Sequence, residues 1–194
     1  MADSIWKSTL EEFRVQLAGR DPVPAGVSVA AVAASLALNL LRKALEITRK
    51  RRDFRGDPRM VEELLARAQA ASDELARLAD EDVAAFVEYM ASRGTPNQES
   101  ANQESALRRA IEVPLRAARV AAEGVELCAE ASAIVPESIA PDLGTAALLL
   151  ASAIHATLLS AESNALQMSD ARFRSEVERE AADLKQLAAM HRRW

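Results

Sequence analysis

The sequence predicts an all-α protein, a helical bundle of about six helices. Strong helix formers dominate the 194 residues, with only six Gly and seven Pro, and no segment alternates convincingly as a strand. About half of the residues are hydrophobic but only 4% are aromatic, so the apolar content is mainly Ala, Leu and Val. Two long segments, Val23–Leu41 and Leu143–Ala161, carry no charge at all. We expect one domain over residues 1–194.

The two uncharged segments are rich in small side chains. Each is about as long as the ~20 residues that a bilayer requires. Their Ala, Ser and Thr content favours central helices that are buried all round in a soluble bundle. Small side chains let two helices approach closely. We therefore expect these two helices at the centre of the fold and no membrane partner.

The first three helices are predicted over residues 4–18, 26–52 and 58–92. The first places Ile5, Leu10, Phe13 and Leu17 on one face and stops at Gly19. The second follows the Pro22 and Pro24 break and ends in a basic run, residues 49–52. The third begins at Pro58 behind Asp57, a capping residue, and has apolar residues at helical spacing.

The last three helices are predicted over residues 99–134, 142–168 and 170 to the end. The loop "RGTPNQ" precedes the first of them, which contains Pro114. The break "VPESIAP" precedes the second, with Asp142 as its expected N-cap. The third alternates charged residues with Val177, Leu184 and Leu187, which is typical of a peripheral amphipathic helix.

Composition excludes several classes of function. A net charge of −5 argues against a general nucleic-acid footprint. The single cysteine, Cys128, forms no internal disulfide, and the N-terminus lacks the order of a signal peptide, so we expect a cytoplasmic protein. His155 and His191 lack ligand spacing with Cys128, so no metal site is expected, and His155 is interpreted as a satisfied core histidine. The common phosphate-loop, dinucleotide and nucleophile-elbow motifs are absent.

The stretch "ADEDVAAF", residues 79–86, contains the strongest candidate for chemistry. Asp82 precedes Phe86 by one helical turn, so the two share a face. A carboxylate at the edge of a core binds its proton more tightly and can act as a general acid or base. The alternative is a solvated acidic patch, which we expect for Asp80 and Glu81.

The starts of the two uncharged helices are candidate binding elements. Their first backbone N–H groups are unpaired and carry partial positive charge, which suits an anion or a polar ring. We expect both N-termini to line one cleft that Asp82 faces; the alternative is that these segments are only core. The basic run at residues 49–52 is either a solvated helix end or a site for a chain of glutamates.

Four stretches in order resemble the all-α cyclodeaminase/cyclohydrolase family that acts on one-carbon tetrahydrofolates. They are "PVPAGVSVAAVAASLALNLL", "DEDVAAFVEYMAS", "AIEVPLRAARVAAEGVEL" and "PDLGTAALLLASAIHATLLSAESNAL". The resemblance implies a helical homodimer, a tetrahydrofolate ligand including polyglutamylated forms, and no further cofactor. It places the functional carboxylate at Asp82. The expected substrate-binding residues are Pro24, Gly26, Ser28, Lys50, Arg51, Arg52, Gln103, Asp142 and Asn164.

Several positions depart from the family pattern. Ala25 and Val27 replace two of three glycines, and Lys50–Phe54 replaces a Gly-Lys-Lys-Lys-Tyr region. Glu104 stands where a glutamine is common, with Gln103 beside it. The function implied is a methenyltetrahydrofolate cyclohydrolase or a formiminotetrahydrofolate cyclodeaminase. The alternatives are a diverged member that binds folate or another small ligand without turnover, and a purely structural bundle.

Overall fold

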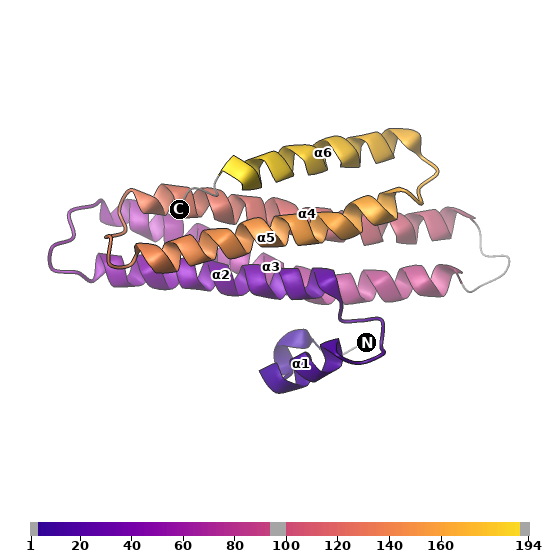
Figure 1. Cartoon of the computed structure of the whole chain (residues 1–194), viewed down its shortest axis with the longest axis horizontal. Coiled ribbons are helices and arrows are strands. Elements are labelled where there is room, and N and C mark those ends of the chain that lie inside the picture. The colour runs from indigo at the N-terminus through magenta and orange to yellow at the C-terminus, as the bar shows by residue number, and fades with distance from the viewer. Residues whose placement is uncertain (1–3, 94–99, 191–194) are drawn as a thin grey trace.

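Six α-helices account for most of the chain. A computed structural model describes residues 4–93 and 100–190 (Figure 1). A short 3₁₀ helix, η1 (Ile5–Lys7), is followed by α1 (Leu10–Leu17), α2 (Gly26–Arg49), α3 (Pro58–Arg93), α4 (Ser100–Ser132), α5 (Ala140–Ala165) and α6 (Ala171–Met190). No strand occurs among these residues, which confirms the predicted fold class. The predicted loop at residues 94–98, the predicted start of a helix at residue 99 and the last four residues lie outside the described part.

The four long helices α2 to α5 form the bundle. Contacts join α2 to α3, α3 to α4, α4 to α5 and α5 back to α2, so the four helices close a ring. Successive helices run in opposite directions along one long axis, and α6 packs on α5 and α4 (Figure 1). The two uncharged helices, α2 and α5, are neighbours at the centre of this arrangement, as the sequence predicts.

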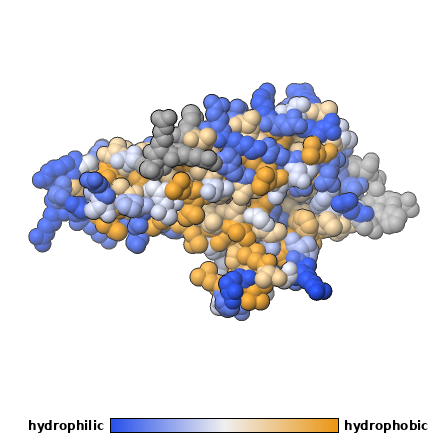
Figure 2. Space-filling view, in the orientation of Figure 1, coloured by the Kyte–Doolittle hydropathy of each residue, from blue (hydrophilic) through white to orange (hydrophobic). Residues whose placement is uncertain are grey.

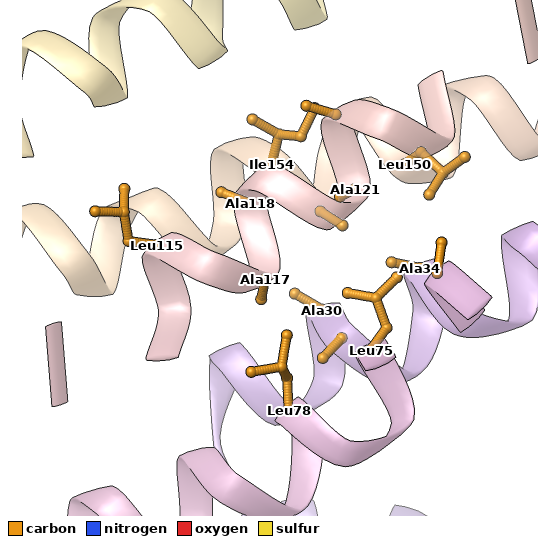
Figure 3. Close-up of a cluster of buried hydrophobic side chains, with 14 of the residues drawn as sticks. Ala30, Ala34, Leu75, Leu78, Leu115, Ala117, Ala118, Ala121, Leu150 and Ile154 are labelled. Carbon is orange, nitrogen blue, oxygen red and sulfur yellow. The ribbon is translucent and has the colours of Figure 1, made fainter. Parts of the chain in front are cut away.

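Small side chains set the close packing at the centre of the bundle. Figure 3 shows Ala30 and Ala34 of α2 among Leu75 of α3 and Ala117 and Ala121 of α4. All five are buried. Because the alanines take little space, the leucines of neighbouring helices fill the gaps between backbones. A Cβ on Gly124 of α4 would lie only 2.9–3.1 Å from methyl groups of Leu38 and Leu150, so the helices also crowd this glycine.

The N-terminal segment differs from the predicted single helix. The chain leaves the helical path at Ser8, and a new helix begins at Leu10 behind a capping box made by Thr9 and Glu12. The capping box satisfies backbone groups that a continuous helix would pair internally. The predicted apolar face is covered only in part: Ile5 and Phe13 pack against the core, whereas no residue of α1 is buried and Leu10 is 81% exposed. In Figure 1, α1 projects from the bundle beside the start of α2.

Most predicted helix ends are close to the observed ones. Asp57 accepts a hydrogen bond from the backbone of Arg59, and Asp170 accepts two from the first turn of α6, which confirms Asp57 as a capping residue. Helix α2 ends at Arg49 rather than residue 52. Helix α5 begins at Ala140, two residues earlier than expected. Asp142 therefore lies in the first turn and is not the N-cap, a position that Ile139 occupies.

The ends of α2 and α5 contradict one prediction. Because the two helices are antiparallel neighbours, the start of α2 lies beside the end of α5, and the start of α5 lies at the opposite end of the bundle (Figure 1). A helix as long as α2 separates its two ends by roughly 35 Å. The expectation that both N-termini line one cleft is therefore wrong within a single chain.

One face of α2 and α5 remains uncovered, so the expectation that these helices are buried all round is wrong. By length and composition alone both helices could cross a bilayer, but 61% and 56% of their most apolar windows are buried inside the bundle, as in core helices. Figure 2 shows apolar side chains gathered over these helices on the side that faces the viewer. We call this surface the open face; its exposed apolar members are Val29, Leu36, Ile47, Leu148, Leu149, Leu159 and Leu166.

Candidate functional site

Asp82 lies in a cavity at the end of the bundle where α2 begins. The cavity has a volume of about 330 Å³. It is lined by Val23, Ala25, Val27, Asp82, Phe86, Ala110, Leu159, Ser160, Ser163 and Asn164. These residues come from the entry to α2, from α3, from α4 and from the last turns of α5. Since Leu159 is also part of the open face, the cavity borders that face.

The carboxylate of Asp82 is partly buried and has a single hydrogen-bonding residue. The hydroxyl of Ser28 donates to Oδ2 of Asp82 at 2.9 Å. Burial raises the pKa of Asp82 above its ordinary value, and hydrogen bonds from the hydroxyl and backbone N–H of Ser28 lower it by less. No cation of the described residues contributes to this pKa. Asp82 is thus an uncompensated carboxylate able to take up or release a proton in a cavity.

The helical register of α3 separates three neighbouring acids. Asp82 and Phe86, one turn apart, both line the cavity, as the sequence predicts. Asp80 instead accepts hydrogen bonds from the hydroxyl of Ser4 (2.6 Å) and the backbone N–H of Ile5 (2.8 Å), which fixes the N-terminal segment to α3. Glu81 pairs with Arg77 and Arg109. Asp80 and Glu81 are therefore structural rather than a solvated patch.

Helix α5 supplies the polar groups opposite Asp82. Ser160, Ser163 and Asn164 line the cavity, and the amide Nδ2 of Asn164 donates to the carbonyl of Ala110 on α4 at 3.0 Å. Asn164 was predicted from the sequence, whereas the two serines were not. Ser160 precedes Asn164 by one helical turn and therefore shares its face. This spacing in the sequence could have predicted Ser160 as a lining residue.

The residues beside Pro24 and Gly26, rather than these two residues themselves, line the Asp82 cavity. Val23, Ala25 and Val27 line the cavity, whereas Pro24 and Gly26 do not. A Cβ on Gly26 would meet nothing within 4 Å, so no close approach requires a glycine there in this chain. Ser28 is fully buried, and its predicted role in substrate binding stays a prediction. Val27 occupies a position where the family pattern has glycine, and its side chain narrows the cavity.

The basic residues and Asp142 lie at the other end of the bundle. Arg51 lines a second cavity of about 360 Å³, formed by the α2–α3 connection and the segment before α5. Arg51 pairs with Asp53 at 2.9 Å, Lys50 lies 3.9 Å from Glu46, and Arg52 is exposed. Together with Asp142 in the first turn of α5, these predicted substrate-binding residues are far from Asp82 within one chain.

Gln103 lies in a third cavity, close to the first. Tyr89, Arg93, Gln103, Glu104, Leu107, Gln167 and Ser169 line a space of about 290 Å³. The Tyr89 hydroxyl donates to Oε1 of Gln167 at 2.7 Å. On α3, Tyr89 of the third cavity lies two helical turns after Asp82 of the first. On α4, Gln103 of the third cavity lies two turns before Ala110 of the first. The two cavities therefore lie one after the other along the contact between α3 and α4.

Other reactive groups do not reach the Asp82 cavity. Cys128 is buried, and burial raises the pKa of its thiol to about 12, which makes it a poor nucleophile. His155 is half-buried, and its Nε2 has no hydrogen-bond partner among the described residues, so the interpretation as a satisfied histidine is wrong. Within residues 4–93 and 100–190, no group of three or more His, Cys, Asp or Glu could hold a metal ion.

Comparisons with known proteins agree with the fold and with the order of the motifs. The chain is 24% identical over 175 residues to a methenyltetrahydrofolate cyclohydrolase of Methylorubrum extorquens, covering 87% of this chain and 84% of that protein. Its fold matches the crystal structure of a formiminotetrahydrofolate cyclodeaminase from Thermotoga maritima with a TM-score of 0.90 and 22% identity, over 97% and 93% of the two chains. The family described as formiminotransferase-cyclodeaminase matches residues 9–183, and the chain belongs to this family.

Proposed function

We propose that this protein is an enzyme that acts on the one-carbon bridge of a tetrahydrofolate, with Asp82 as the proton-transfer group. The observation that carries the proposal is the uncompensated carboxylate in the Asp82 cavity. A buried carboxylate without a cationic partner is costly to ionise. A methenyl or formimino carbon bound between two nitrogens carries positive charge, so such a substrate would supply the missing cation.

The first version of the reaction is cyclohydrolysis, the activity named for the relative from M. extorquens. Water adds to the methenyl carbon, and Asp82 removes a proton from that water. The bond from this carbon to N5 then breaks, the hydroxyl of the adduct loses its proton, N5 gains one, and 10-formyltetrahydrofolate is formed. The hydroxyls of Ser160 and Ser163 lie in the same cavity and are suited to orient the water or the substrate. The raised pKa of Asp82 brings the proton affinity of this base closer to neutral pH.

The second version is cyclodeamination, the activity named for the protein from T. maritima. Nitrogen N10 attacks the formimino carbon, and ammonia leaves after it has gained a proton. Asp82 would supply that proton, since a carboxyl with a raised pKa remains protonated for longer as the pH rises. Both versions use the same residue, and no additional cofactor enters either of them.

The alternative is a member that binds folate or another small ligand without turnover. The observation that favours it is the lining of the cavity: Ala25 and Val27 stand where the family pattern has glycines. Their side chains occupy space that a ligand would otherwise reach.

Turnover of methenyltetrahydrofolate, followed by absorbance, tests the enzyme proposal. We expect Asp82→Ala to lower turnover by about 10²–10⁴-fold. Asp73→Asn is the control, because Asp73 is an exposed acid on the same helix, and among the described residues its carboxylate accepts a hydrogen bond from Gln69 alone. Equal, uncatalysed rates for wild type and Asp82→Ala would reject turnover, and calorimetry with folates would then decide whether the cavity binds them.

A homodimer follows as part of the same proposal. The open face repeats apolar residues at the spacing Val29, Leu36, Leu40, Ile47, which is typical of a seam against another helix. A twofold axis across the bundle would place the far end of a second copy near the Asp82 cavity. Arg51, Arg52 and Asp142 of that copy would then complete the site, and the two arginines would meet the pterin or the glutamate carboxylates of the substrate.

Charge on the open face tests the dimer. Leu36 is 52% exposed, and Leu36→Glu should give a monomer in sedimentation equilibrium. Val87→Glu is the matched control, since Val87 is equally exposed but lies on α3, outside the open face. A dimer that survives Leu36→Glu would contradict the proposal. We also propose a cytoplasmic location, where folate one-carbon substrates and a reduced Cys128 are expected.

A further inference from the structure

Ser28 reaches the candidate site only through Asp82. Its exposed fraction is 0%, so no ligand in the cavity can touch it. Its hydroxyl donates to Oδ2 of Asp82, and its backbone N–H also supports the charged form of that carboxylate. Apart from Ser28, no described residue forms a hydrogen bond with the carboxylate of Asp82.

The start of α2 explains why this contact is strong. Ala25 is the N-cap of α2 and offers no side-chain hydrogen bond, so the first backbone N–H groups have no local partner. The carboxylate of Asp82, which comes from α3, lies at this helix start, where the hydroxyl of Ser28 donates to it. The positive end of a helix dipole favours an ionised carboxylate. The side chain of Ser28 thus holds Asp82 at the first turn of α2.

We propose that Ser28 is the positioning residue of Asp82, holding the carboxylate in one orientation at the cavity and favouring its ionised form against burial. The role of Ser28 in the reaction rests on the proposed function. The positioning of Asp82 by Ser28 rests on the contact between the two residues.

Ser35 provides a matched control on the same helix. It lies two turns after Ser28, so both serines share one face of α2, and both are buried, at 0% and 3% exposure. The hydroxyl of Ser35 contacts Ser72 of α3 rather than a carboxylate, with Oγ–Oγ 2.9 Å. Ser28→Ala and Ser35→Ala therefore each delete one buried hydroxyl from the α2–α3 contact, but only the first touches Asp82.

The experiment is a carboxyl ¹³C NMR titration of the full chain with labelled aspartate. The Asp82 signal is assigned by its loss in Asp82→Asn. We expect Ser28→Ala to raise the pKa of Asp82 by about one pH unit, because a hydrogen bond to the charged form is lost. Ser35→Ala should leave this pKa unchanged, and Ser28→Thr, which keeps the hydroxyl, should restore it. The acid limb of the kcat/KM profile should move with the titration.

The two readouts separate the inference from the proposed function. An unchanged Asp82 pKa in Ser28→Ala, or an equal change of that pKa in Ser35→Ala, overturns the inference even if the wild type turns over substrate. A wild type without turnover rejects the proposed function and leaves the titration to decide whether Ser28 controls Asp82. If Ser28→Ala does not fold, Ser28→Cys, with a similar size and a weaker donor, gives the same comparison.

Discussion

The two ends of the α2–α5 pair differ in charge. At the end where α2 begins, Asp82 shares a cavity with serines, an asparagine and apolar side chains, and no cation of the described residues contributes to its pKa. At the other end, residues 49–52 form an unbroken run of four cations, of which Arg51 lines a second cavity. Three of these cations lie close to acids: Arg49 and Lys50 to Glu46, and Arg51 to Asp53. The proposed function assigns the chemistry to the first end and the binding of an anionic group to the second.

The largest expected effect comes from placing a cation beside Asp82. Ser163 lines the cavity and is exposed, so Ser163→Lys should fit there. The ammonium would lower the pKa of Asp82 and repel a cationic substrate, and we expect kcat/KM at neutral pH to fall by about tenfold or more. Ser163→Glu is the control of opposite sign and should raise the pKa of Asp82. If both variants move the pH profile of kcat/KM in the same direction, the charge beside Asp82 does not control activity at this end of the bundle.

The next largest effect is expected between the two ends, where Gly124 of α4 packs against α2 and α5. A Cβ on Gly124 would crowd methyl groups of Leu38 and Leu150. We expect Gly124→Val to lower the free energy of unfolding by about 1–3 kcal/mol, measured in urea. Gly26→Ala is the matched control, because a Cβ there meets nothing within 4 Å and should be neutral or slightly stabilising. Equal changes in the free energy of unfolding for the two variants would show that the close packing around Gly124 is unimportant.

The stability contribution of Asp82 should depend on pH. Because its folded-state pKa is raised, its contribution is fully present below the unfolded-state pKa and is lost as the pH rises through the folded-state pKa. Asn does not titrate, so Asp82→Asn should gain stability relative to wild type between about pH 4 and pH 7. A difference of one between the folded-state and unfolded-state pKa values corresponds to about 1.4 kcal/mol. A difference in Tm between the two proteins that stays constant over this range would contradict the raised pKa.

The smallest effect is expected at the basic end. Arg51 and Asp53 form an exposed pair, and such pairs add little to stability. Arg51→Ala should leave Tm unchanged and raise only KM, and more for a polyglutamylated substrate than for a monoglutamate. A fall in kcat instead would mean that Arg51 takes part in the chemistry, and the two ends would then not be separate in function.

The sequence was most informative where local rules decide the structure. Asp57 has the residue type of a cap and the position before Pro58, and the structure confirms both the cap and the helix that follows. The shared face of Asp82 and Phe86 follows from helical spacing alone. Local rules did not decide the exposure of Leu10, because whether an apolar face is covered depends on what lies opposite it. Here α1 projects from the bundle with none of its residues buried.

The residue pattern by itself determined the fold class, the two uncharged central helices and the face of α3 that carries Asp82, because these follow from composition and the 3.6-residue period. Tertiary structure alone decided that α2 and α5 are antiparallel, which separates Asp82 from Arg51 and Asp142 by most of the bundle length. It also decided that the hydroxyl of Ser28 meets the carboxylate of Asp82. The reason is that helical spacing defines which residues share a face, whereas helix direction and the partner of each buried group depend on connections and packing across the whole bundle.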